Sequence, residues 1–164
     1  GVNKMAKVEK TNVMRILDQK KINYKSYEYS DTEAISGVEV AEVLGENPNQ
    51  VFKTLVTVGA TKANYVFMIP VHKELDLKKA AKAVGEKSIA MIKSKELLPL
   101  TGYIHGGCSP IGMKKQFRTV IDASAADFDT ILFSGGKIGF QVEVTISDLS
   151  KVVRYEMADV VVIE

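Results

Sequence analysis

The stretch "VFKTLVTVGATKANYVFMIP", residues 51–70, holds two runs rich in β-branched and aromatic residues, separated by the loop-forming segment "GATKA". Two runs of this composition around a short glycine-containing loop predict a β-hairpin. Residues 51–58 and 64–70 are therefore expected to be paired strands, and the rest of the fold is interpreted around them.

Helices and further strands are predicted on both sides of this hairpin. Helical patterns with capping or stop signals cover 11–22, 36–45, 76–85, 94–100 and 147–153. Thr11, Ser36, Asp76 and Ser147 are the candidate N-caps, and Pro99 is expected to cut the fourth helix after one turn. Strands are expected at 24–30, 119–122, 130–134, 139–145 and 158–163. This mixture predicts one α+β domain around a curved, mixed or mainly antiparallel sheet flanked by helices.

The composition is that of an ordinary water-soluble domain. The chain has 164 residues, of which 46% are apolar and 26% charged, and its net charge is +2. So mild a charge does not indicate a nucleic-acid binder by bulk electrostatics, although a local basic cleft remains possible. The single cysteine excludes an internal disulfide and is compatible with the reducing cytoplasm. Two histidines and one cysteine cannot build a typical structural zinc site without help from carboxylates. Neither a metal nor a cofactor is expected.

The ends of the chain carry no targeting signal in this interpretation. Gly1–Lys4 ahead of Met5 resemble a cloning remnant, so residues 1–10 are expected to be a disordered start and 11–164 the domain. The start lacks the apolar core of a signal peptide. No apolar run approaches the roughly 20 residues of a membrane span, so no membrane partner is expected.

Lys53 is the residue out of place in the first strand of the hairpin. Side chains alternate between sheet faces, so Lys53 lies between Val51 and Leu55 on one side. An ammonium there is costly to bury without a partner. Two explanations stay open: the side chain extends to solvent, or it lies at the floor of a pocket and supplies a compact charge for a phosphate or carboxylate.

The segment "TGYIHGGCSP", residues 101–110, is the other candidate for chemistry. The bare amides of Gly106 and Gly107 could stabilise an oxyanion, or the pair could be a plain turn. Gly135-Gly136 presents the same ambiguity. Cys108 lacks an evident base and a third orienting group, so a buried bystander is favoured over a nucleophile.

Five blocks resemble the YbaK/EbsC family, which comprises free-standing relatives of the editing domain of bacterial prolyl-tRNA synthetases. They are "NPNQVFKTL", "LDLKKAAKAVG", "TGYIHGGCSPIGMKK", "TVIDASAADFDTILFSGGKIGFQVEV" and "DL…ADV", and they span about Asn12 to Val161. The resemblance implies the α+β fold described above. It also implies an aminoacyl-tRNA deacylase that acts on mischarged tRNA, chiefly Cys-tRNA(Pro). A synthetase distinguishes near-isosteric amino acids by only about 1–3 kcal/mol, so a second, hydrolytic site is the physical remedy.

The resemblance also implies roles for individual residues. Lys53, with Thr54 beside it, would hold the phosphate of the terminal nucleotide, and the amides of Gly106 and Gly107 would face the scissile carbonyl. Ser134 would line the pocket, and Tyr27 would lie near the acceptor end. The thiol of the misattached cysteine would attack its own ester and form a thiolactone, so the protein would contribute positioning and oxyanion stabilisation.

Two positions depart from the family pattern. Gln141 stands where well-studied members carry an aspartate, and Ser36 stands where they carry a phenylalanine. Both are expected to contact the substrate and to affect amino-acid specificity. They leave two alternatives open: an alanine-specific deacylase that activates water, or a non-catalytic RNA-binding or regulatory relative.

The expected partner is the acceptor end of a mischarged tRNA. A backbone track could be lined by four basic residues, although a solvated surface explains them equally well: Lys114, Lys115, Arg118 and Lys137. The resemblance further implies a transient complex with prolyl-tRNA synthetase that would supply tRNA selectivity.

Overall fold

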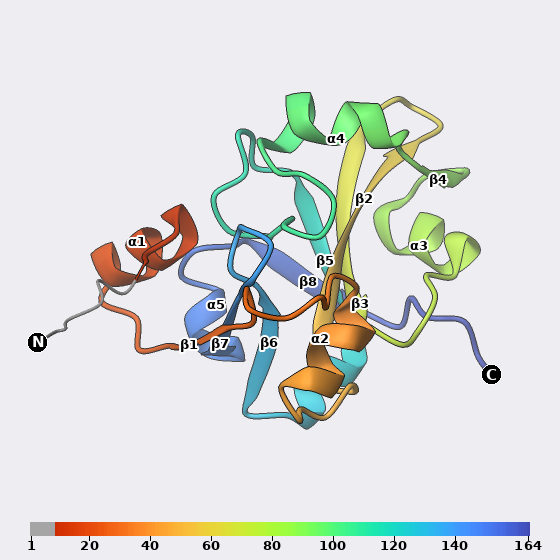
Figure 1. The fold of residues 1–164 in the computed structure, drawn as a ribbon. Helices are drawn as coiled ribbons and strands as arrows, with labels where there is room; N and C mark the ends of the chain where they lie inside the picture. The colour runs from red at the N-terminus through yellow and green to blue at the C-terminus, as the bar shows by residue number, and fades with distance from the viewer. Residues whose placement is uncertain (1–8) are drawn as a thin grey trace, which may run out of the picture.

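The computed structural model describes residues 9–164 and contains two β-sheets with helices around them (Figure 1). The elements in chain order are α1 (Asn12–Gln19), β1 (Lys25–Glu28), α2 (Gly37–Val43), β2 (Phe52–Gly59), β3 (Asn64–Pro70), α3 (Leu77–Val84), β4 (Ile89–Met91), α4 (Ser94–Thr101), β5 (Arg118–Asp122), the 3₁₀ turn η1 (Ala123–Asp127), β6 (Thr130–Ser134), β7 (Phe140–Thr145), α5 (Ile146–Leu149) and β8 (Tyr155–Ala158). The prediction that residues 1–4 are a cloning remnant lies outside the described residues.

The predicted hairpin is confirmed and forms the middle of the larger sheet. That sheet has the strand order β4-β2-β3-β5-β8, with β2 and β3 antiparallel and β3, β5 and β8 parallel. The smaller sheet, β1-β7-β6, is antiparallel throughout. An isolated bridge between Val51 and Leu132 joins the two sheets. The α+β class with a mixed sheet is therefore confirmed, whereas the division into two sheets was not predicted.

The core forms two layers, one on each face of the larger sheet. On one face, Ala80, Ala81 and Val84 of α3 pack against Phe67 and Ile69. The opposite face packs onto the smaller sheet and α1, as Figure 1 shows. Alternate residues of β3 thus enter different layers, which is the period-two pattern of a strand covered on both sides.

Local capping chemistry begins α1, α2 and α3 where the sequence predicts them. The Thr11 hydroxyl accepts from the Met14 N–H, and Ser36 forms a capping box at α2. Asp76 Oδ1 accepts two N–H groups at the start of α3, and Gly85, with φ +74°, ends it.

Three sequence predictions need correction. Pro99 does not end α4, which continues to Thr101, because the carbonyl that Pro99 leaves unpaired belongs to the exposed Lys95 and can bond water. Helix α5 covers only Ile146–Leu149 and is capped by Thr145 rather than Ser147, since the Thr145 hydroxyl reaches the Asp148 N–H at 3.1 Å.

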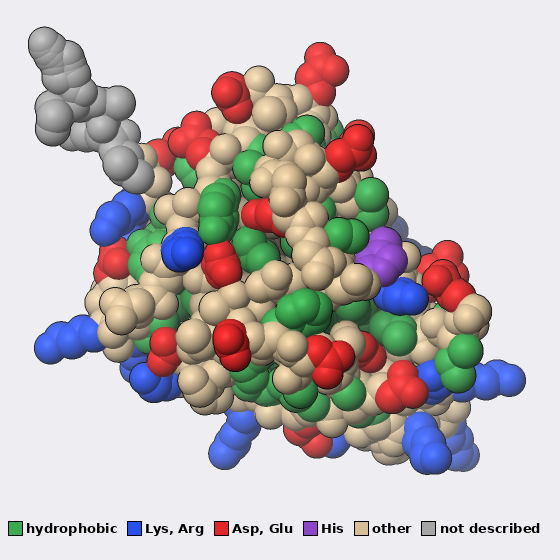
Figure 2. Space-filling view, turned by 90° about the horizontal axis from the view of Figure 1, so that it is seen from below, with side chains coloured by type: hydrophobic (Ala, Val, Ile, Leu, Met, Phe, Trp, Pro, Cys, Tyr) green, Lys and Arg blue, Asp and Glu red, His purple; other side chains and the backbone are tan. Residues whose placement is uncertain are grey.

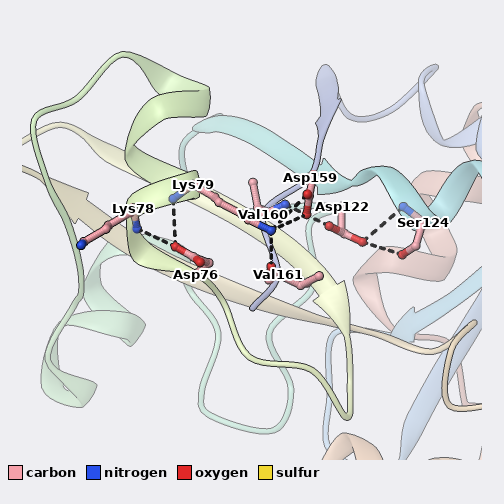
Figure 3. A network of polar contacts seen from close by, with 8 residues as sticks. All are labelled: Asp76, Lys78, Lys79, Asp122, Ser124, Asp159, Val160 and Val161. Atoms are coloured by element: carbon pink, nitrogen blue, oxygen red, sulfur yellow. Dashed lines mark hydrogen bonds and ion pairs between the residues drawn. The ribbon is translucent and has the colours of Figure 1, made fainter. Parts of the chain in front are cut away.

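The third correction concerns the last strand, which is Tyr155–Ala158 rather than 158–163. Beyond Ala158 the chain leaves the sheet and binds the start of α3 (Figure 3). The Asp76 N–H donates to the Val160 carbonyl at 2.8 Å, and Lys79 Nζ donates to the Val161 carbonyl at 2.9 Å. The apolar run that predicted a strand is thus used to cover α3.

Asp122 is the buried centre of this C-terminal network (Figure 3). It is 3% exposed, and its carboxylate accepts from the Val160 N–H at 3.1 Å and from the Ser124 N–H and hydroxyl at 3.2 and 2.6 Å.

We expect Asp122→Ala to lower the free energy of unfolding by about 3 kcal/mol, because buried donors lose their acceptor. Urea denaturation measures this. Asp159→Ala, which breaks only the exposed ion pair with Lys79, is the control and should cost less than about 1 kcal/mol; equal losses would contradict the assignment.

Candidate active site

A cavity of about 370 Å³ opens where the two sheets meet. Its walls come from β2, the start of α2, the β6–β7 hairpin and the segment 102–117, which contains no helix or strand. Six of the residues predicted from the sequence line it: Ser36, Lys53, Thr54, Gly106, Ser134 and Gln141. Segments far apart in the chain thus bring most of the predicted site together.

The cavity lies against an open edge of β2, and this explains why five consecutive residues, 51–55, all contribute to it. Successive residues of a strand direct their peptide groups to opposite neighbours. The Val51 carbonyl and the Gly59 N–H bond on the β3 side of β2. The even-numbered residues between them therefore direct their N–H and C=O groups to the opposite side, away from β3. On that side β4 pairs only with Thr57–Gly59. The backbone of Thr54 therefore borders the cavity without a neighbouring strand.

Lys53 is half-buried in the cavity wall, and within the described part of the chain its ammonium has no hydrogen bond or ion pair. Burial lowers the pKa of Lys53, and Glu74 opposes this by its charge. An ammonium left so short of solvent and partners gains from any anion that enters the cavity. The structure thus places Lys53 in the cavity wall and half-buried, not on a fully exposed face of the strand.

Gly106 lines the cavity and has an unpaired N–H among the described residues, whereas Gly107 does not line it. Residues 104–107 form a reverse turn closed by the Gly107 N–H, which donates to the Ile104 carbonyl at 3.0 Å. Gly106 has φ +88°, typical of the third position of a type II turn. Its own N–H has no acceptor in residues 9–164. The prediction that both amides face the substrate is therefore corrected: Gly107 is buried, is engaged in the turn and does not line the cavity.

The polar end of the cavity is built on the smaller sheet. Ser134 and Gln141 lie directly opposite each other on β6 and β7, so their side chains share a face. The Ser134 hydroxyl accepts from the Gly136 N–H at 3.1 Å, and Gln141 Nε2 donates to Glu46 Oε1 at 2.9 Å. The Thr54 hydroxyl is buried and has no partner among the described residues. The Ser36 hydroxyl is already used to cap α2.

Comparison with known proteins identifies this arrangement. Residues 32–152 match the family described as the aminoacyl-tRNA editing domain. An Enterococcus faecalis protein whose provisional name is Cys-tRNA(Pro)/Cys-tRNA(Cys) deacylase EbsC is 45% identical over 153 residues, or 93% of each chain. The chain belongs to the YbaK/EbsC family of aminoacyl-tRNA editing domains. The resemblance inferred from the five sequence blocks is thereby confirmed.

Solved structures agree with the fold of this YbaK/EbsC-family protein. A structure provisionally described as a trans-editing enzyme for prolyl tRNA synthetase has a TM-score of 0.76 at 23% identity and covers 92% of this chain and 96% of that chain. A hypothetical protein of known structure has a TM-score of 0.80 at 21% identity, covering 92% and 99%. At these identities the likeness shows the fold alone.

Tyr27 lies outside the cavity of this family member. Its hydroxyl donates to Glu143 Oε1 at 2.7 Å, which raises the pKa of Tyr27 to about 12. Tyr29, which the sequence analysis did not select, lines the cavity instead. Strand β1 ends at Glu28, and the Tyr29 N–H donates to the Gly139 carbonyl at 2.7 Å. In a regular strand Tyr27 and Tyr29 would lie on the same face, so the alternation of side chains did not indicate that Tyr29 lines the cavity and Tyr27 does not.

The four basic residues predicted to bind RNA do not line the cavity. Arg118 is held by Glu156, with contacts of 2.7 and 3.3 Å, and Lys137 pairs with Glu9. Lys114 and Lys115 are exposed on the segment 102–117. A backbone track through these residues remains a prediction, and Arg118 would have to leave its carboxylate partner to join it.

Cys108 lines the cavity, but its environment opposes a nucleophilic role. Burial raises the pKa of Cys108 to about 12, so the thiolate is scarce at neutral pH. We expect Cys108→Ala to keep deacylation within about threefold of the original protein, because the thiol is not the attacking group. Single-turnover deacylation measures this; a folded but inactive Cys108→Ala protein would overturn the mechanism proposed below.

No group of three potential metal ligands occurs within residues 9–164.

Proposed function

We propose that the protein deacylates mischarged tRNA in trans, with Cys-tRNA(Pro) as its preferred substrate. The observation that carries this proposal is that one cavity is lined both by the half-buried, unpaired Lys53 and by Gly106, whose N–H has no acceptor among the described residues. The name of the Enterococcus relative points to the same substrate. Lys53 binds the phosphate of the terminal nucleotide, and the Gly106 N–H donates to the carbonyl oxygen of the ester as negative charge develops on it.

The nucleophile in this proposal is the thiol of the misattached cysteine. Its sulfur attacks the ester carbonyl, a C–S bond forms, the C–O bond to the ribose breaks, and the thiol proton ends on the released ribose hydroxyl. The products are a cyclic thiolactone, which water then opens, and free tRNA. Because nucleophile and ester belong to one molecule, the protein need only hold them in the reactive geometry.

The chemistry of the wall favours this route over attack by water. Among the described residues that line the cavity there is no aspartate or glutamate that could serve as a general base. Cys108 stays protonated, and His105 lies at the exposed rim. An alanine-specific enzyme would need such a base, and a non-catalytic relative would bind acceptor-stem RNA without turnover.

The tRNA backbone would approach from a side other than α2. Between Lys25 and Lys53 the sequence contains six acidic residues and no Lys or Arg. The face seen from below carries Asp and Glu across its middle and most of its Lys and Arg at the margin (Figure 2). So acidic a surface repels phosphates. The candidate track is therefore Lys114, Lys115, Arg118 and Lys137, and two of these, Arg118 and Lys137, would first have to leave their carboxylate partners. A transient complex with prolyl-tRNA synthetase would add the missing tRNA affinity.

The proposed partners place the reaction in the cytoplasm. Within residues 9–164, no helix combines the length and apolarity that crossing a bilayer requires. Neither a metal nor a cofactor is needed for the proposed step.

The test is incubation of the protein with Cys-tRNA(Pro) while the surviving ester is measured over time. Deacylation well above the uncatalysed rate supports the proposal. Survival of the ester at the uncatalysed rate, with prolyl-tRNA synthetase present as well as absent, would contradict it. Binding of acceptor-stem RNA under those conditions would indicate the non-catalytic alternative.

A further inference from the structure

Three buried side-chain oxygens near the cavity lack a hydrogen-bond partner in the described part of the chain: Thr54 Oγ1, Gln141 Oε1 and Glu46 Oε2. Buried polar atoms are almost always paired, and each unpaired one costs free energy. Unpaired acceptor oxygens gathered in one place indicate that a group carrying N–H or O–H donors binds there. Two of the three belong to residues that line the cavity, so a ligand could supply that group.

The orientation of the Gln141 amide is fixed by Glu46. Gln141 is 2% exposed and lies on β7, between Tyr27 on β1 and Ser134 on β6. A carboxylate only accepts hydrogen bonds, so the amide must turn its Nε2 toward Glu46, which it contacts at 2.9 Å. The acceptor Oε1 is left without a donor among the described residues, on a side chain that lines the cavity.

Glu46 supplies negative charge immediately behind this amide. It follows α2, where its N–H donates to the Ala41 carbonyl at 2.8 Å, and it makes no ion pair within residues 9–164. Burial and the nearby Glu143 raise the pKa of Glu46, as expected for a carboxylate with no cation beside it. A cation in the cavity would relieve this cost.

We propose that Gln141 binds the α-ammonium group of the aminoacyl ester and that Glu46 is the positioning residue that orients Gln141 and supplies the charge. This inference rests on the proposed function and names the substrate group recognised at that site. Every aminoacyl ester carries its α-ammonium on the carbon next to the ester carbonyl. Binding the ammonium at Gln141 therefore helps to hold that carbonyl at a set position in the cavity.

The test compares cysteinyl-tRNA(Pro) with 3-mercaptopropionyl-tRNA(Pro), which keeps the thiol but lacks the α-amine. We expect the original protein to prefer the cysteinyl ester in kcat/KM by about 30-fold, equivalent to about 2 kcal/mol. Glu46→Gln should reduce this preference to less than about fivefold and leave cleavage of the amine-free ester unchanged. A merely structural role would lower both rates equally, and that result would overturn the proposal.

Two further variants complete the experiment. The exchange Glu46→Gln with Gln141→Glu keeps one amide and one carboxylate in contact, so it should restore most of the preference. Glu42→Gln removes an exposed charge from α2, four residues before Glu46, and should change nothing. A double variant as weak as Glu46→Gln, although folded, would count against the pair acting as a unit.

A binding measurement separates this inference from the proposed function. Amide-linked analogues of both esters cannot be cleaved, and their affinities can be measured by calorimetry. If the original protein cleaves neither ester, the proposed function fails, and the affinity ratio of the analogues still decides whether the ammonium is bound. Equal affinities for the two analogues would contradict the role of Gln141 and Glu46.

Discussion

Lys53→Met is expected to lower kcat/KM for Cys-tRNA(Pro) by about 1000-fold, equivalent to about 4 kcal/mol of transition-state stabilisation. The variant removes a charge-assisted contact to phosphate from a half-buried site, which accounts for about 1.5–3 kcal/mol. Misplacement of the ester relative to the Gly106 amide adds the remainder. Single-turnover deacylation measures the loss.

Two controls define what the Lys53 result means. Lys82→Met removes one exposed positive charge from α3, outside the cavity, and should keep the rate within about threefold. Lys53→Arg retains the charge with a larger head group and should recover part of the activity. A folded Lys53→Met protein with nearly full activity would remove the cation from the mechanism.

Changing the substrate is expected to have an effect as large as changing the protein. We expect Cys-tRNA(Pro) to be cleaved about 1000-fold faster than Ala-tRNA(Pro), which lacks an internal nucleophile. Ser-tRNA(Pro) should be cleaved at least about 100-fold more slowly than the cysteinyl ester, because a hydroxyl is a weaker nucleophile than a thiol near neutral pH. The three esters should be assayed side by side at one protein concentration. Alanyl and cysteinyl esters cleaved within about tenfold of each other would favour water activation instead.

Much of the fold could be predicted because its signals are local. The hairpin at 51–70 and the caps Thr11, Ser36 and Asp76 depend on residues a few positions apart. Strand β4 has only three residues, two of them exposed, so it has no periodicity to detect. The strand predicted at 158–163 failed because an apolar run is equally suited to covering a helix.

The site could be predicted only in part. Lys53 is conspicuous because a cation in an apolar strand needs an explanation, and Gly106 because of the glycine pair. The role of Gly107 depends on which amide closes the turn, and a pair of adjacent glycines does not reveal that. Glu46 could not be found at all, since its contact with Gln141 joins residues 95 positions apart.

The most direct measurement is a crystal structure with a non-cleavable analogue in which cysteine is joined by an amide to a terminal adenosine 5′-phosphate. The proposed mechanism predicts Lys53 Nζ about 3 Å from a phosphate oxygen and the Gly106 N–H about 3 Å from the carbonyl oxygen of the cysteinyl group. A well-ordered analogue bound in this cavity with its phosphate away from Lys53, or its carbonyl turned away from Gly106, would contradict it.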